Sequence, residues 1–201
     1  MVKVKICGIR RAEDIEIINK YPPDYIGFVF AESKRQIDFD TAKTLKKLLK
    51  VNIPVVGVFV NGNIENILEL YRNDIIDIAQ LHGDENEDYI NQLKEEARGL
   101  KLIKAIEITK KEDLNDYENM DVEYILLDSG KGSGKTFNWD LINKNISKDF
   151  FLAGGLNSAN FNQVIEGFQP YGIDLSSGVE TNGYKDEEKI KKIMELKNEE
   201  M

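Results

Sequence analysis

Short apolar stretches alternate with longer amphipathic segments along almost the whole chain. Some of the apolar stretches, such as 55–60, are hydrophobic throughout, which is typical of parallel strands buried on both faces. The segments between them carry apolar residues three and four positions apart, as in Ile64, Ile67, Leu68 and Tyr71, and this spacing predicts helices with one buried face. The pattern predicts eight strands, at 2–6, 25–30, 55–60, 75–81, 100–106, 122–128, 150–153 and 172–175.

Helical spacing recurs at 42–49, at 161–168 and at 190–194, the last after an acidic start that suits a helix N-terminus. Near 114–117 and 141–142 the pattern supports no more than one or two helical turns.

Strands that alternate with helices require right-handed parallel crossovers. Eight such units in 201 residues predict a single-domain (β/α)8 TIM barrel of near-minimal length that spans residues 1–201. A doubly wound open sheet is the competing architecture, and it usually carries a G-x-G-x-x-G turn after its first strand. Here that turn reads Cys7-Gly8-Ile9-Arg10-Arg11, which favours the barrel.

Composition narrows the class of protein. A formal net charge of −9, from 27 basic and 36 acidic residues, argues against nucleic-acid binding. The single cysteine cannot form an internal disulfide, and one cysteine with one histidine cannot build a Cys/His metal site. No apolar run of about 18 residues predicts a membrane span, and the first residues lack a signal-peptide pattern. We therefore expect a cytoplasmic protein without a metal or a membrane partner.

Glycines gather at one end of the predicted barrel, where the loops after the strands build active sites. Ten of the 15 glycines follow a strand's carboxyl end: Gly8, Gly62, Gly83, Gly130, Gly132, Gly134, Gly154, Gly155, Gly178 and Gly183. The loops after the seventh and eighth strands contain Gly154, Gly155, Ser176, Ser177 and Gly178, whose exposed N–H and hydroxyl groups suit a phosphate. Tight turns capped by serine are the structural alternative.

Cys7 ends the first strand and Asp128 ends the sixth, so both occupy positions typical of catalytic groups in barrels. The alternatives are a small buried apolar side chain for Cys7 and a loop cap for Asp128. Lys5 lies two residues before Cys7 on the same strand face, and its ammonium would favour the thiolate.

Nine motifs, in order and over essentially the whole chain, resemble the phosphoribosylanthranilate isomerase family. They are Lys5-Ile6-Cys7-Gly8-Ile9, Gly27-Phe28-Val29-Phe30, Ser33-Lys34-Arg35, Val56-Gly57-Val58-Phe59, Gln80-Leu81-His82-Gly83, Leu127-Asp128-Ser129, Phe137-Asn138-Trp139, Ala153-Gly154-Gly155-Leu156 and Asp174-Leu175-Ser176-Ser177-Gly178-Val179-Glu180.

The resemblance implies a cofactor-free Amadori rearrangement of a phosphorylated small-molecule substrate in tryptophan biosynthesis. It implies Asp128 as general acid and Cys7 as general base. It also implies that Arg35 meets the anthranilate carboxylate and that Asp174 handles substrate hydroxyls or the migrating proton. Gln80 and His82 are expected to line the pocket, although a structural role at the strand end is nearly as well supported for His82.

Two positions depart from the family pattern. Lys34 replaces a proline in the usual Ser-Pro-Arg, and Lys131 replaces a glycine in the usual Gly-Gly-Thr-Gly. Both put the loop conformation in question rather than the chemistry.

Two rival functions remain open at this point. One is another phosphate-binding barrel enzyme of the same pathway, such as indole-glycerol-phosphate synthase, and the other is a non-catalytic phospho-ligand sensor. The cysteine at the end of the first strand argues against the first, and the presence of both Cys7 and Asp128 argues against the second. The polar helix faces make a monomer the expected state, with a homodimer as the alternative.

Overall fold

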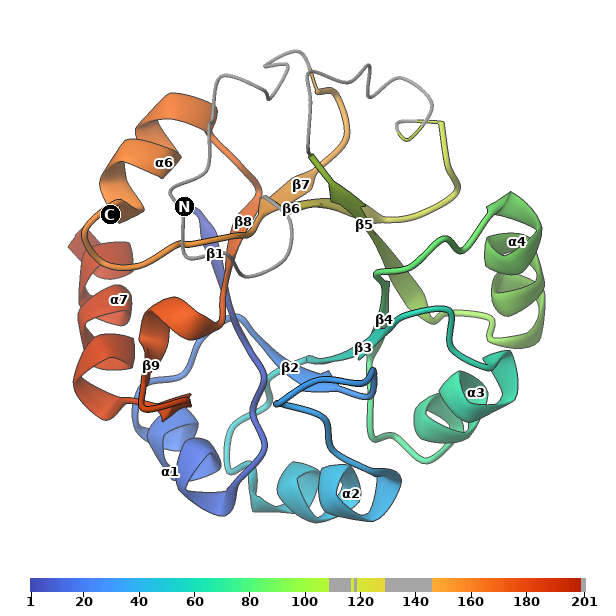
Figure 1. Cartoon of the computed structure of the whole chain (residues 1–201), viewed down its shortest axis with the longest axis horizontal. Helices are drawn as coiled ribbons and strands as arrows, with labels where there is room; N and C mark the ends of the chain where they lie inside the picture. The colour runs from blue at the N-terminus through green and yellow to red at the C-terminus, as the bar shows by residue number, and fades with distance from the viewer. Residues whose placement is uncertain (109–116, 118, 129–145, 200–201) are drawn as a thin grey trace.

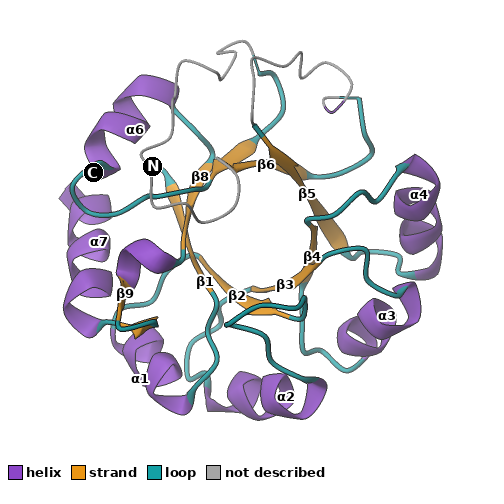
Figure 2. Ribbon diagram, in the orientation of Figure 1, coloured by secondary structure: helices purple, strands orange, loops and turns teal. Residues whose placement is uncertain are grey.

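In the computed structural model, eight parallel strands close into a barrel in which each strand pairs with its neighbours in chain order (Figures 1 and 2). The structure describes residues 1–108, 117, 119–128 and 146–199. The strands are β1 (Lys3–Cys7), β2 (Tyr25–Val29), β3 (Val55–Phe59), β4 (Ile78–Leu81), β5 (Lys101–Glu107), β6 (Tyr124–Asp128), β7 (Phe150–Leu152) and β8 (Gly172–Leu175). The barrel prediction is therefore confirmed, and the open-sheet alternative is wrong because β1 pairs with β8.

Every predicted strand is present, and the largest difference in bounds is at β4. The apolar run begins at residue 75, but the strand begins at Ile78. Ile75 and Ile76 are buried in the layer outside the barrel, so their hydrophobicity reports burial and not strand pairing.

Helices surround the barrel in the described part of the chain (Figure 2). They are α1 (Ala12–Lys20), α2 (Phe39–Leu48), α3 (Ile64–Arg72), α4 (Glu87–Glu96), α6 (Phe161–Phe168) and α7 (Glu187–Glu199). Side-chain caps fix several starts; Asp38, for example, accepts the Thr41 N–H at the beginning of α2. The short helices predicted near 114–117 and 141–142 lie outside the described residues, except for Tyr117. None of the described helices is long and apolar enough to cross a membrane.

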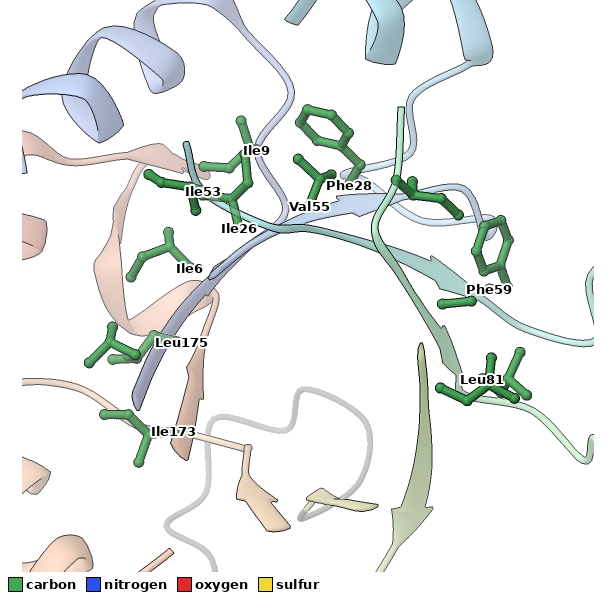
Figure 3. Packing of buried hydrophobic residues seen from close by; sticks show 14 of the residues in the cluster. Ile6, Ile9, Ile26, Phe28, Ile53, Val55, Phe59, Leu81, Ile173 and Leu175 are labelled. Carbon is green, nitrogen blue, oxygen red and sulfur yellow. The ribbon is translucent and has the colours of Figure 1, made fainter. Parts of the chain in front are cut away.

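The apolar core has two layers. The larger layer lies between the strands and the helices, and Figure 3 shows its side chains on the outer face of the barrel, among them Ile6, Ile26, Val55, Ile173 and Leu175. The smaller layer fills the barrel interior with Val56, Ile78, Ile103, Ala105, Leu126, Phe151 and Ala153. Because side chains alternate along a strand, the residues between the outer-layer positions point inward.

A short hairpin that the sequence analysis did not predict follows β8. A 3₁₀ turn (Ser177–Val179) leads into β9 (Glu180–Thr181), which pairs with β10 (Tyr184–Lys185). Asn182 and Gly183 both have positive φ angles, of 53° and 80°. Asn-Gly between two extended segments is a strong signal for such a turn, and it could have revealed the hairpin.

Candidate active site

Cys7 is the last residue of β1 and points into the barrel, because its neighbour Ile6 belongs to the outer layer. The thiol is buried. Gly27 lies opposite it on β2, and a Cβ at Gly27 would lie 2.7 Å from the Cys7 Sγ. The glycine in the Gly27-Phe28-Val29-Phe30 motif therefore makes room for this thiol.

Lys5 and Asp174 form an ion pair beside the thiol. They are register partners on β1 and β8, and Lys5 Nζ lies 2.8 Å from Asp174 Oδ2. The Lys5 side chain is fully buried. Within the described chain the other carboxylate oxygen, Asp174 Oδ1, is buried and has no hydrogen-bond partner. A buried acceptor of this kind is costly unless a further donor meets it.

Burial raises the pKa of the Cys7 thiol, and the charge of Asp174 raises it further. The Lys5 ammonium opposes both effects without overcoming them. The expectation that Lys5 favours the thiolate has the correct sign, but its effect is smaller than that of burial. The thiol is therefore predominantly protonated at neutral pH in this state.

On the other side of the barrel, His82 contacts Asp128. His82 follows β4 and Asp128 ends β6; His82 Nε2 lies 3.4 Å from Asp128 Oδ2, and both side chains are partly exposed. Gln80 Nε2 lies 3.3 Å from His82 Nδ1. With the Gln80 amide in this orientation its N–H donates to Nδ1, and a neutral His82 then carries its ring proton on Nε2, toward Asp128. All three are site residues expected from the sequence, but no sequence pattern predicts this chain of contacts.

Arg35 is bound by a carboxylate that the sequence analysis did not assign to the site. Its Nε and Nη2 donate to Glu180 Oε1 and Oε2, each at 2.7 Å. Lys185 Nζ donates to the same Glu180 Oε1 at 2.7 Å. The Glu180 hydrogen bond is the main cause that raises the pKa of Arg35. The signal in the sequence that could have identified Glu180 is its place as the one charged residue in Ser-Gly-Val-Glu, directly after the predicted phosphate loop.

The predicted phosphate loops after β7 and β8 lie against each other. Gly154 and Gly155 have φ angles of 92° and 66°, which only glycine adopts readily. A Cβ at Gly178 would lie 1.8 Å from the Leu156 carbonyl oxygen. Ser177 is exposed, and the Ser176 carbonyl accepts a hydrogen bond from Lys185 Nζ at 3.1 Å. The structure thus brings the two loops together at the carboxyl end of the barrel.

The two departures from the family pattern have different outcomes. The Lys34 carbonyl accepts a hydrogen bond from Arg10 Nη1 at 2.5 Å, so a backbone contact restrains the loop where a proline is usual. Lys131, with the other residues of its loop, lies outside the described residues. Among the described residues no group of three or more His, Cys, Asp or Glu side chains could hold a metal ion.

Comparison with known proteins agrees with the motif pattern. The family model described as N-(5′-phosphoribosyl)anthranilate isomerase matches residues 4–196. The chain is 50% identical to the isomerase of that name from Clostridium acetobutylicum, over 96% of this chain and 97% of the relative.

Two crystal structures of phosphoribosylanthranilate isomerases have the same fold. One, in complex with reduced 1-(o-carboxyphenylamino)-1-deoxyribulose 5-phosphate, has a TM-score of 0.84 at 35% identity, covering 97% of each chain. The other, of monomers generated from the dimeric enzyme of Thermotoga maritima, has a TM-score of 0.86 at 34% identity, covering 99% of this chain and 100% of the other.

Proposed function

The chain belongs to the N-(5′-phosphoribosyl)anthranilate isomerase family, and on that premise we propose that Cys7 is its general base and Asp128 its general acid. The protein is an isomerase of tryptophan biosynthesis that acts on a phosphorylated small molecule. The observation that carries the proposal is the placement of both side chains on the inner face of the barrel, at the carboxyl ends of β1 and β6.

The proposed reaction transfers one proton to the substrate and removes another. Asp128 protonates the ribose ring oxygen of N-(5′-phosphoribosyl)anthranilate, and the C1′–O bond breaks to give an open-chain Schiff base. Cys7 then takes the C2′ proton, and the resulting enolamine tautomerises to 1-(2-carboxyphenylamino)-1-deoxyribulose 5-phosphate. Substrate and product are isomers, so no redox partner is needed.

The surroundings of both groups support these roles. A protonated Asp128 is the form that can act as an acid, and the His82 Nε2–H can donate to the carboxylate that remains after proton transfer. The raised pKa of Cys7 makes its thiolate a strong base once formed, and Lys5 limits the cost of forming it.

Three further groups are proposed to bind the substrate. Arg35 binds the anthranilate carboxylate through its planar guanidinium. Asp174 Oδ1, the buried acceptor without a partner in the described chain, accepts a ribose hydroxyl. The loops that contain Gly154, Gly155, Ser176, Ser177 and Gly178 bind the phosphate with local N–H and hydroxyl donors, while Gln80 and His82 line the pocket.

Two substitutions test the acid and the base. General acid–base groups contribute about 10²- to 10⁴-fold each, so Cys7→Ser and Asp128→Asn should lower kcat by at least that order. The loss of anthranilate fluorescence as substrate is consumed measures the rate. The control Asp121→Asn removes an exposed aspartate that pairs with Lys94, and it should keep full activity.

Near-full activity in a folded Cys7→Ser or Asp128→Asn protein would refute that residue's assignment. Both substitutions preserve side-chain size and should leave the barrel intact. Circular dichroism checks that each variant is folded.

We also propose that residues 1–201 form one domain that works as a cytoplasmic monomer, without a nucleic-acid or membrane partner. The large exposed hydrophobic residues of the described chain come from four separate segments: Met1, Leu48, Val60 and Tyr184. Sedimentation at assay concentration should therefore give the mass of one chain, and the mass of a homodimer would contradict the monomer.

A further inference from the structure

Glu180 is a buried carboxylate next to the active site that the proposed reaction does not use. Its side chain is 6% exposed and lies between Arg35 and Lys185. Although burial opposes ionisation, hydrogen bonds from these two cations hold the pKa of Glu180 below its usual range. Glu180 is therefore an ionised group at neutral pH, with both oxygens engaged.

The contact between Glu180 and Arg35 uses only one edge of the guanidinium. Glu180 accepts from Nε and Nη2. A guanidinium has five N–H donors in one plane, so the edge formed by Nη1 and the second Nη2 proton is not used by Glu180. In the part of the chain that the structure describes, no group accepts a hydrogen bond from Nη1. This second edge has the geometry that binds a carboxylate through two parallel hydrogen bonds.

The Arg35 side chain is fixed in position by its surroundings. A Cβ at Gly8, the residue after Cys7, would lie 2.4 Å from the Arg35 Cδ, so the arginine packs directly against the chain just past the end of β1. Arg10 donates from Nη1 to the Lys34 carbonyl and from Nη2 to the Gly183 carbonyl, at 2.8 Å in the second case. The β9–β10 hairpin thus holds the Arg35 loop through both Glu180 and Gly183.

We propose that Glu180 is a positioning residue that makes the enzyme selective for an arylamine substrate with an ortho carboxylate. It holds one edge of Arg35 so that the opposite edge faces the anthranilate carboxylate. The inference rests on the proposed contact between Arg35 and that carboxylate. It adds that specificity for the carboxylate depends on the hairpin as well as on the arginine.

The sign of the effect separates positioning from simple charge. Arg35, Glu180 and Lys185 together carry a net charge of +1, and Glu180→Gln would raise this to +2. A pure charge effect would therefore strengthen the binding of an anionic substrate and lower KM. A positioning role predicts a higher KM, because a guanidinium that has lost its two hydrogen bonds to Glu180 also loses the orientation that a bidentate pair with the substrate requires.

The experiment compares two substrates, N-(5′-phosphoribosyl)anthranilate and N-(5′-phosphoribosyl)aniline, which lacks the carboxylate. Glu180→Gln should raise KM for the first by about 10- to 100-fold, the range expected for hydrogen bonds to charged groups. It should change KM for the second by less than about twofold, because no carboxylate is present. Glu180→Asp keeps the charge but shortens the side chain, and it should reproduce the KM increase.

A double-mutant cycle with Arg35→Lys completes the test. Arg35→Lys alone should raise KM for the anthranilate substrate, and Glu180→Gln should add little in that background. The matched control is Glu123→Gln at the amino end of β6, where Glu123 accepts the Leu102 N–H and pairs with Lys94; it should leave both KM values unchanged.

The outcomes distinguish the two proposals. If Arg35→Lys leaves KM unchanged, the proposed contact of Arg35 with the carboxylate is wrong. If Arg35→Lys raises KM but Glu180→Gln and Glu180→Asp do not, or if they affect both substrates equally, the positioning role of Glu180 is overturned while the proposed reaction stands.

Discussion

Two opposite charges act on the Cys7 thiol at the same time. Lys5 lies beneath it on the same face of β1, and Asp174 pairs with Lys5 from β8. The first lowers the pKa of Cys7 and the second raises it, while burial raises it most. A base in such a place combines high basicity with a nearby cation that limits the cost of its ionisation.

This arrangement predicts that two substitutions shift the thiol pKa in opposite directions. Lys5→Met removes the cation that favours the thiolate, so the pKa of Cys7 should rise. Asp174→Asn removes the anion that disfavours it, so the pKa should fall. Because Cys7 is the only cysteine, the pH dependence of alkylation by iodoacetamide reports this one thiol directly.

The pH profile of kcat/KM gives an independent measurement of the same shifts. The limb that reports deprotonation of the base should move to higher pH in Lys5→Met and to lower pH in Asp174→Asn. Shifts in the same direction for both variants would show that repacking around Cys7, and not charge, sets the thiol pKa. The control Lys3→Met removes a cation that pairs with Asp24, and it should leave the thiol pKa unchanged.

At the scale of elements, the site depends on close contact between loops that follow neighbouring strands. The loop after β8 approaches the loop after β7 so closely that Gly178 has no space for a side chain beside the Leu156 carbonyl. That carbonyl is backbone and cannot turn away as a flexible side chain would.

We therefore expect Gly178→Ala to separate the two loops. The substitution should lower stability by about 1–3 kcal/mol, as overpacking typically does. It should also raise the KM for substrate and the Kd for inorganic phosphate, because the proposed phosphate donors come from both loops. Urea unfolding and isothermal titration with phosphate measure the two effects.

Gly167→Ala is the matched control for this substitution. Gly167 lies within α6, and beyond its own helix backbone a Cβ there would meet no atom within 4 Å. Alanine is the better helix former by roughly 1 kcal/mol, so this variant should be slightly more stable and bind phosphate normally. Equal phosphate affinity in the two variants would contradict the proposed phosphate site.

The sequence predicts the elements better than it predicts the contacts between them. Apolar runs such as 55–60 and helical spacing such as 64–71 depend on burial, which is a local pattern, and both are confirmed. The same strand pattern puts Cys7 and Asp128 at strand ends, where the structure has them. Glu180 and Arg35 are 145 residues apart in the sequence. Their hydrogen bonds depend on barrel closure and on the geometry of the hairpin, which no local pattern reveals.

At the scale of the whole molecule, single carboxylates that are buried or half-buried connect segments that are distant along the chain. Asp24 accepts hydrogen bonds from the Val4 N–H and from Lys197 Nζ, and so joins β1 to α7. Glu85 accepts from the Asn61 and Gly83 N–H groups, which follow β3 and β4, and from Lys104 Nζ in the middle of β5, and so joins three neighbouring strands. Burial opposes the ionisation of both carboxyls, but these donors hold the pKa values of both below their usual range.

The lowered pKa of Glu85 predicts how the stability of the protein depends on pH. Its contribution is present above the pKa of an unfolded glutamate, about 4.3, and is lost as the pH falls through the lower folded value. Glu85→Gln should therefore lower the free energy of unfolding by about 3–5 kcal/mol at neutral pH, because it leaves Lys104 buried without its counter-ion. The difference from the unsubstituted protein should shrink as the solution becomes more acidic. Urea unfolding across this pH range measures the difference.

Glu65→Gln, in an exposed pair with Arg72, is the control and should change stability by less than about 1 kcal/mol at every pH. A Glu85→Gln deficit that stays constant down to the acid limit would mean that side-chain packing, and not the ionised carboxylate, holds these three strands together.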